Sequence, residues 1–203
     1  MQVQIRSRSR VTLHRLIPAF PMRITSQRGQ QSITRRGFSR PLRDGESVGV
    51  AAFESIDLHL TGGVFAPSMC RIELADTPIA WLDDSHVPPD SALARIQYLR
   101  ELISGTIFHN PQQTLNAQAV ATSLHTTPNR IRSALFMQGA AFTHLCRTQR
   151  LMRALFDAFQ FNLSVADLTT RVGWADRRDL ETSFHDWFGV SLQTISRLRE
   201  DCL

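Results

Sequence analysis

The chain has 203 residues, 42% of them hydrophobic, which is enough to bury a sizeable core in one large domain or two small ones. No run of 18 apolar residues is present, so a membrane-spanning helix is excluded, and the start lacks the apolar stretch of a secretory signal. With a net charge of +5 and three cysteines (Cys70, Cys146 and Cys202) that form no CxxC pair, we expect a cytoplasmic protein with reduced thiols.

The first 46 residues carry most of the positive charge and show no sustained hydrophobic period. They contain ten Arg against Asp44 and Glu46, in stretches such as RSRSR and TRRGFSR. We predict that residues 1–46 form a basic, disordered arm, either a plain extension or one that strengthens nucleic-acid contact nonspecifically. The composition also fits a mitochondrial transit segment, and Met22 offers an alternative start of translation.

Residues 47–90 predict a short β-rich segment followed by a linker. Alternating apolar residues in IDLHL and CRIEL, separated by Gly and Pro turns, indicate three or four short strands over residues 47–82. DDSHVPPDS, residues 83–91, has the composition of a linker. The helical spacing that follows it predicts a helix with Asp90 or Ser91 as its N-cap.

Residues 91–203 show helical spacing of apolar residues throughout. A short helix is predicted over residues 116–124. Thr127 then supplies the N-cap of a second helix, and Pro128 suits its first position because a missing amide hydrogen costs nothing there. A long helix over residues 142–159 follows, so these segments form a helix-turn-helix unit and a connector.

The same arrangement repeats after the connector. Ser164 and Asp167 have capping-box spacing, Asp176 is the expected N-cap of the next helix, and Gly189 suits its left-handed end. The apolar face of that helix consists of Leu180, Phe184 and Trp187 or Phe188. The predicted fold class is therefore mainly α: a C-terminal bundle with two helix-turn-helix units joined by a long helix, after the β-rich segment and the disordered N-terminus.

LSVADLTTRVGWADRRDLETSFHDWFGVS, residues 163–191, resembles the AraC/XylS family of bacterial transcription regulators. It has the family's Leu-Ser start, its Val-Gly-aromatic turn and its Phe-Gly-Val-Ser end. TTPNRIRSALFMQGAAF, residues 126–142, is similar to the first unit of the family's C-terminal domain. The resemblance covers about half of the chain. It departs at Leu192 and Ile195, where the family has Pro and an aromatic residue, and at Asp157, where Leu is common.

The resemblance implies a sequence-specific DNA-binding transcription regulator, an activator by family habit, that inserts two recognition helices into successive major grooves. Double-stranded DNA is the implied partner, together with RNA polymerase and a second copy or a protein co-regulator, at the nucleoid. The implied DNA-binding residues are Asn129, Arg130, Arg132 and Ser133 in the first unit and Arg177, Arg178, Glu181 and Thr182 in the second. Arg pairs well with guanine and Asn with adenine.

Some charged residues have a second interpretation. An arginine pair on an exposed helix is often only a solvated face, and Glu181 could form an ion pair with Arg178 instead of meeting cytosine. Arg147, Arg150 and Arg153, three apart on the connector, either contact phosphate or keep that helix soluble.

An enzyme is the first alternative class of function. The sequence has no HExxH, GxSxG, GxxxxGK or GxGxxG motif, and its seven histidines are scattered. His59 is a single imidazole on an alternating strand, which favours a structural role over zinc binding. We expect no catalysis, no metal and no cofactor.

A protein-interaction module is the second alternative. Asp179, Glu181 and Asp186 lie on or near the second recognition helix and would repel a DNA backbone that approached them. This cluster fits a divergent helical protein that binds another regulator or RNA polymerase without direct DNA readout.

Overall fold

The computed structural model describes residues 1–75 and 92–199, in which eight strands precede seven helices. The strands are β1 (Gln2–Ser7), β2 (Arg10–Leu16), β3 (Met22–Arg28), β4 (Gln30–Arg35), β5 (Phe38–Leu42), β6 (Ser47–Val50), β7 (Ile56–Thr61) and β8 (Ser68–Leu74). The helices are α1 (Ala92–His109), α2 (Ala117–Ser123), α3 (Pro128–Met137), α4 (Phe142–Gln160), α5 (Val165–Arg171), α6 (Arg177–Phe188) and α7 (Leu192–Leu198).

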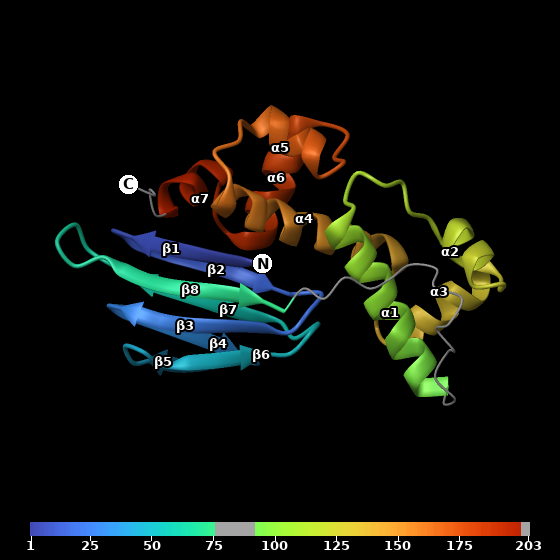
Figure 1. The fold of residues 1–203 in the computed structure, drawn as a ribbon, viewed down its shortest axis with the longest axis horizontal. Coiled ribbons are helices and arrows are strands. Elements are labelled where there is room, and N and C mark those ends of the chain that lie inside the picture. The colour runs from blue at the N-terminus through green and yellow to red at the C-terminus, as the bar shows by residue number, and fades with distance from the viewer. Residues whose placement is uncertain (76–91, 200–203) are drawn as a thin grey trace.

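The strands form two antiparallel four-stranded sheets, ordered β1-β8-β3-β6 and β2-β7-β4-β5, which lie one over the other (Figure 1). Most strands alternate buried side chains with more exposed ones, as in β8, where every second residue is buried, whereas β5 at the edge of its sheet is exposed except at Leu42. The inward residues of both sheets belong to one hydrophobic core. Strands β1 and β2 belong to different sheets, and each lies at an edge of its sheet.

The predicted disorder of residues 1–46 is wrong, and so is the mainly α fold class, because β1 to β5 lie in this segment. The apolar residues Val3, Ile5, Val11 and Leu13 do alternate, and all four are buried. Arg6, Arg8 and Arg10 stand between them, and Arg8 and Arg10 are exposed. High charge therefore coexists with a strand pattern, since period-2 alternation needs only every second side chain to be apolar.

Residues 47–74 form β6, β7 and β8, in agreement with the short strands expected there. The predicted linker and the proposed N-cap residues Asp90 and Ser91 lie outside the described residues. Over residues 92–199 no helix is long and apolar enough to cross a membrane.

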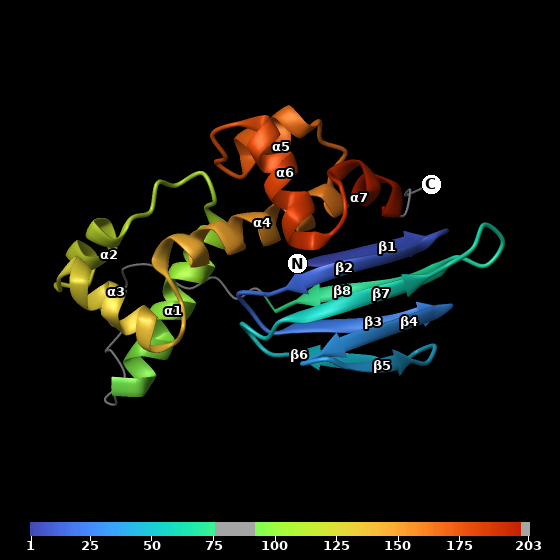
Figure 2. The ribbon, with the colours of Figure 1, turned by 180° about the vertical axis from the view of Figure 1, so that it is seen from behind.

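Three helices cover the open side of the sandwich at its β1 and β2 edges. Helices α4 and α7 pack on β1, and α6 packs on β2 (Figures 1 and 2). An isolated antiparallel bridge joins Ile5 of β1 to Arg199, just after α7. The helices thereby cover two edge strands whose unpaired backbone groups could otherwise pair with other chains.

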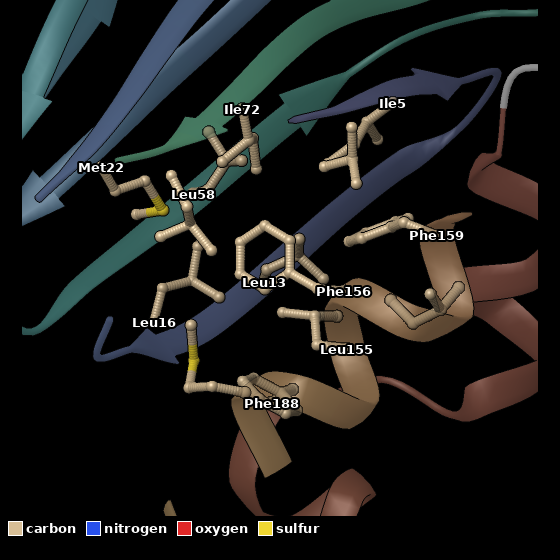
Figure 3. Close-up of a cluster of buried hydrophobic side chains, with 14 of the residues drawn as sticks. Ile5, Leu13, Leu16, Met22, Leu58, Ile72, Leu155, Phe156, Phe159 and Phe188 are labelled. Carbon is tan, nitrogen blue, oxygen red and sulfur yellow. The ribbon is translucent and has the colours of Figure 1, made fainter. Parts of the chain in front are cut away.

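Helix α4 passes through two separate hydrophobic cores. Its N-terminal Leu145 and Cys146 pack with residues of α1, α2 and α3. Its C-terminal Leu155, Phe156 and Phe159 point into the sandwich, toward the inward residues of both sheets (Figure 3). The first helix-turn-helix unit thus has a core of its own, whereas the second shares the core of the sandwich.

Truncation of Phe156 tests this shared core. Phe156 is 1% exposed, so we expect Phe156→Ala to lower the free energy of unfolding by about 3–5 kcal/mol in urea denaturation. Phe38→Ala is the matched control, because Phe38 is 82% exposed and its loss should change stability by less than about 0.5 kcal/mol. Equal effects of the two substitutions would contradict the packing of α4 into the sandwich.

The buried thiols give a second test. Burial raises the pKa of the Cys70 thiol to about 12 and that of Cys146 to about 11. At pH 8 the reactive thiolate is therefore on the order of one molecule in a thousand or fewer. In a Cys202→Ser variant, we expect a thiol-reactive disulfide reagent to react slowly with the native protein and to titrate both thiols after denaturation. Fast reaction of the native variant would show that one of these residues is accessible.

Candidate nucleic-acid interface

The first helix-turn-helix unit consists of α2 and α3, each with a side-chain cap. Asn116 Oδ1 accepts from the Ala119 amide at 2.8 Å, and the Thr127 hydroxyl accepts from the Arg130 amide at 3.4 Å. Both caps satisfy amide groups that have no partner within the helix. The expected role of Thr127 is confirmed. Ile131 and Leu135 face inward with exposures of 3% and 0%.

The second unit consists of α5 and α6 and is capped in the same way. Ser164 accepts from the Asp167 amide at 3.1 Å, and Asp176 accepts from the Asp179 amide at 2.9 Å. Gly189 ends α6 in the left-handed region at φ 74°, as predicted. The inward face of α6 is fully buried and consists of Leu180, Phe184 and Phe188.

The four DNA-binding residues predicted on α3 are all exposed: Asn129, Arg130, Arg132 and Ser133. Arg132 Nη1 donates to Asn129 Oδ1 at 3.3 Å, so these two side chains are neighbours on one surface. Phe136 lies on the same stripe, one turn beyond Arg132, and is 81% exposed. An apolar ring held in water beside Arg and Asn side chains is suited to contact with a thymine methyl group.

On α6, Arg177, Arg178 and Thr182 are exposed and Glu181 is half-buried. The partner of Glu181 is Arg177, with an N–O distance of 3.7 Å, rather than the Arg178 considered from the sequence. Arg178 forms no ion pair within the part of the chain that the structure describes. Its guanidinium is thus the more available of the two for a base or a phosphate.

Both units border one surface cleft of about 520 Å³. Arg132 comes to it from α3, Arg147 and Arg150 from α4, and Trp174 and Asp179 from the second unit. Asp179 is engaged within the chain, because its carboxylate accepts from Trp174 Nε1 at 2.6 Å. This hydrogen bond ties Asp179 to the turn before α6. The indole carries no charge, so the carboxylate stays negative and its repulsion of a DNA backbone remains a prediction.

The arginines of the connector make intramolecular contacts. Arg147 Nη2 donates to Ser183 Oγ at 2.7 Å, and Arg150 donates to the carbonyls of Pro111 and Gln113. Arg153 donates to the Phe108 carbonyl at 3.1 Å. These contacts fix α4 against α6, against α1 and against the segment between α1 and α2. The sequence does not indicate this role, because the partners are distant along the chain.

Asp157 explains one departure from the family pattern. Its carboxylate is fully buried and pairs with Arg153 Nε at 2.9 Å and with Arg171 Nε at 2.8 Å. Arg171 belongs to α5, so the pair of bonds holds the second unit against α4. The other departures also fit, since Leu192 and Ile195 are buried in the shared core and Ser191 caps α7 through the Thr194 amide.

The C-terminal end of α6 is fixed to β2 by Arg15. Arg15 stands at a β-bulge with a left-handed φ of 50°, a conformation that costs a non-glycine residue on the order of 1 kcal/mol. Its guanidinium donates to the Asp186 carbonyl and lies 5.0 Å from the centre of the Trp187 ring. Trp187 Nε1 donates back to the Arg15 carbonyl at 3.1 Å. The orientation of α6 relative to the sandwich is therefore specified by side chains.

His59 lies between two hydroxyl groups on the outer face of its sheet. Its Nδ1 is 3.0 Å from Thr12 Oγ1 and its Nε2 is 2.8 Å from Thr34 Oγ1. The imidazole thus links β2, β7 and β4, which confirms the structural interpretation.

The arrangement of the sandwich and the helices is similar to that of solved structures. ToxT from Vibrio cholerae O395 superposes with a TM-score of 0.68 at 10% identity, over 98% of this chain and 97% of that one. The chain therefore has the fold of ToxT. A ToxT structure from strain SCE256 with a bound unsaturated fatty acid gives the same TM-score at 9% identity, over 98% of this chain and 95% of ToxT.

Comparison by sequence adds nothing to this likeness. No family profile matches the sequence, and no curated protein matches it.

Removal of the Asp157 carboxylate tests how the second unit is held. Asp157→Ala leaves the guanidinium of Arg153, 14% exposed, without its carboxylate partner, so we expect a loss of about 3–5 kcal/mol in the free energy of unfolding. Most of the loss is assigned to Arg153, because Arg171 is 41% exposed and solvent weakens its ion pair. Asp186→Ala, at a side chain 73% exposed, is the control and should change stability by less than about 0.5 kcal/mol. A loss no larger than that of the control would exclude Asp157 as the link between α4 and α5.

Proposed function

We propose that the chain is a transcription regulator that binds duplex DNA through α3 and α6. The observation that carries the proposal is the pair of capped helices, each with a buried apolar face and an exposed face that bears arginine. The two units border a common cleft within a chain that has the fold of ToxT, an AraC-family protein. A helix of this kind fits the major groove, where each base pair presents a different pattern of donors and acceptors.

The contacts of each arginine favour different roles at the DNA. Arg178 has no ion pair in the described residues and is suited to bidentate contact with guanine. Arg177 is held by Glu181 and is suited to positioning a phosphate. On α3, Arg132 and Asn129 support each other and form a second base-reading pair. By the family resemblance the regulator activates transcription and contacts RNA polymerase.

Selection of duplexes from a random pool with the full chain, followed by anisotropy titration of the selected duplex, tests the proposal. We expect Arg178→Ala to weaken binding of that duplex about tenfold or more, because one good guanine contact contributes about 1–3 kcal/mol. Binding to unselected DNA should change much less. Arg177→Ala should weaken both duplexes similarly and reduce the salt dependence of binding.

Arg23→Ala is the matched control, since Arg23 is an exposed arginine on β3 in the distal half of the sandwich. It should leave the affinity for the selected duplex within about twofold. If selection enriches no sequence, or if Arg178→Ala and Arg23→Ala behave alike, direct readout by α6 is wrong. The interaction-module alternative would then account better for the exposed helices.

A further inference from the structure

A groove of about 770 Å³ lies where the sandwich meets the helices, away from the surfaces assigned to DNA. Its floor and walls come from the turn between β1 and β2, from β2, and from α7 with the end of α6. It borders Gly189, at the opposite end of the 12-residue α6 from Arg177 and Arg178. A helix of this length is about 18 Å long, so the groove and the arginine pair are well separated.

The groove is lined by arginines from both parts of the molecule. Arg6, Arg8 and Arg10 come from the sandwich, and Arg197 and Arg199 come from the helical side. The described lining residues include no Asp or Glu. The lining also includes His14, whose Nδ1 lies 3.3 Å from Oδ2 of Asp57 on β7.

The guanidinium groups are poorly satisfied by the protein itself. Arg6 Nε is buried from solvent and has no acceptor among the described residues. None of the five arginines has a carboxylate partner within residues 1–75 and 92–199. Like charges gathered in a partly enclosed groove repel each other, and a bound anion would remove this cost while it accepts the free N–H groups.

We propose that this groove binds a small phosphorylated ligand with at least two phosphate groups. Guanidinium groups match phosphate oxygens in geometry, and five of them suit a polyanion better than a single charge. The apolar side chains in the lining are Val11, Val190 and Leu198, of which Val11 and Leu198 are buried, so arginines make up most of the polar groups that a ligand would meet. The ligand would bridge the β1–β2 turn and α7, and would thereby tighten the contact between the sandwich and the second helix-turn-helix unit.

Calorimetric titration of the full chain with inorganic pyrophosphate and with ATP tests the site, without DNA present. We expect saturable binding with one ligand per chain, and a rise of the melting temperature on binding. Arg8→Gln/Arg197→Gln removes one charge from each wall and should weaken binding at least tenfold. Arg23→Gln/Arg43→Gln removes the same charge at exposed positions outside the groove and should leave affinity within twofold. Stronger binding of ATP than of pyrophosphate would identify the ligand as a nucleotide. Equal binding of the two would show that the groove recognises only the linked phosphate groups.

Several outcomes would overturn the site. They are absence of saturable binding, equal loss in the two double variants, and tighter binding of oleate than of pyrophosphate. A fourth is loss of duplex DNA affinity in Arg8→Gln/Arg197→Gln without any pyrophosphate binding, which would assign the groove to the DNA backbone. Glu200 and Asp201 follow Arg199 in the sequence, outside the described residues. If the unchanged chain does not bind pyrophosphate but the Glu200→Gln/Asp201→Asn double variant does, the chain's own carboxylates occupy the groove. The proposal then fails.

Discussion

The open edges of β1 and β2 impose the constraint on which the rest of the structure depends. Two facing sheets that end in edge strands on the same side leave a strip of backbone and inward apolar residues to be covered. Phe156 and Phe159 of α4 fill that opening, and α6 and α7 complete the cover. The helices that would present one half of the DNA-binding surface are therefore also part of the wall of the sandwich.

This double role makes the two helix-turn-helix units unequal. The second unit is tied to the sandwich through Arg15 and Trp187 and to α4 through Asp157. The first unit rests on α1 and the N-terminal half of α4, in a core that is separate from the sandwich. Helix α4 connects the two units, and its arginines fix it to α1, to the segment before α2 and to α6. The turn after α5 also lies against that segment, since a Cβ added at Gly173 would be 2.5 Å from the Pro111 carbonyl oxygen.

The arginines have three distinct environments, although they look alike in the sequence. Arg150 and Arg153 donate to backbone carbonyls and serve packing. Arg132 and Arg178 are exposed on helices with buried apolar faces, the placement that supports DNA readout. Arg8 and Arg197 lie on opposite walls of one groove, where excess positive charge favours a bound anion. Net charge alone separates none of these roles, because each is defined by what the guanidinium group can reach.

The sequence by itself determined the local features of the helical half. Capping residues such as Thr127 and Asp176, the end of α6 at Gly189 and the inward face of Leu180 and Phe184 all depend on neighbours within four residues. The sequence did not predict the strands of residues 1–46, because abundant arginine obscured their period-2 alternation. The apolar residues of that alternation become a core only when the second sheet covers them. The tertiary structure alone decided the buried pairing of Asp157, the contact of Arg15 with α6 and the gathering of arginines in one groove. Each of these joins residues that are distant along the chain, so no local pattern could specify it.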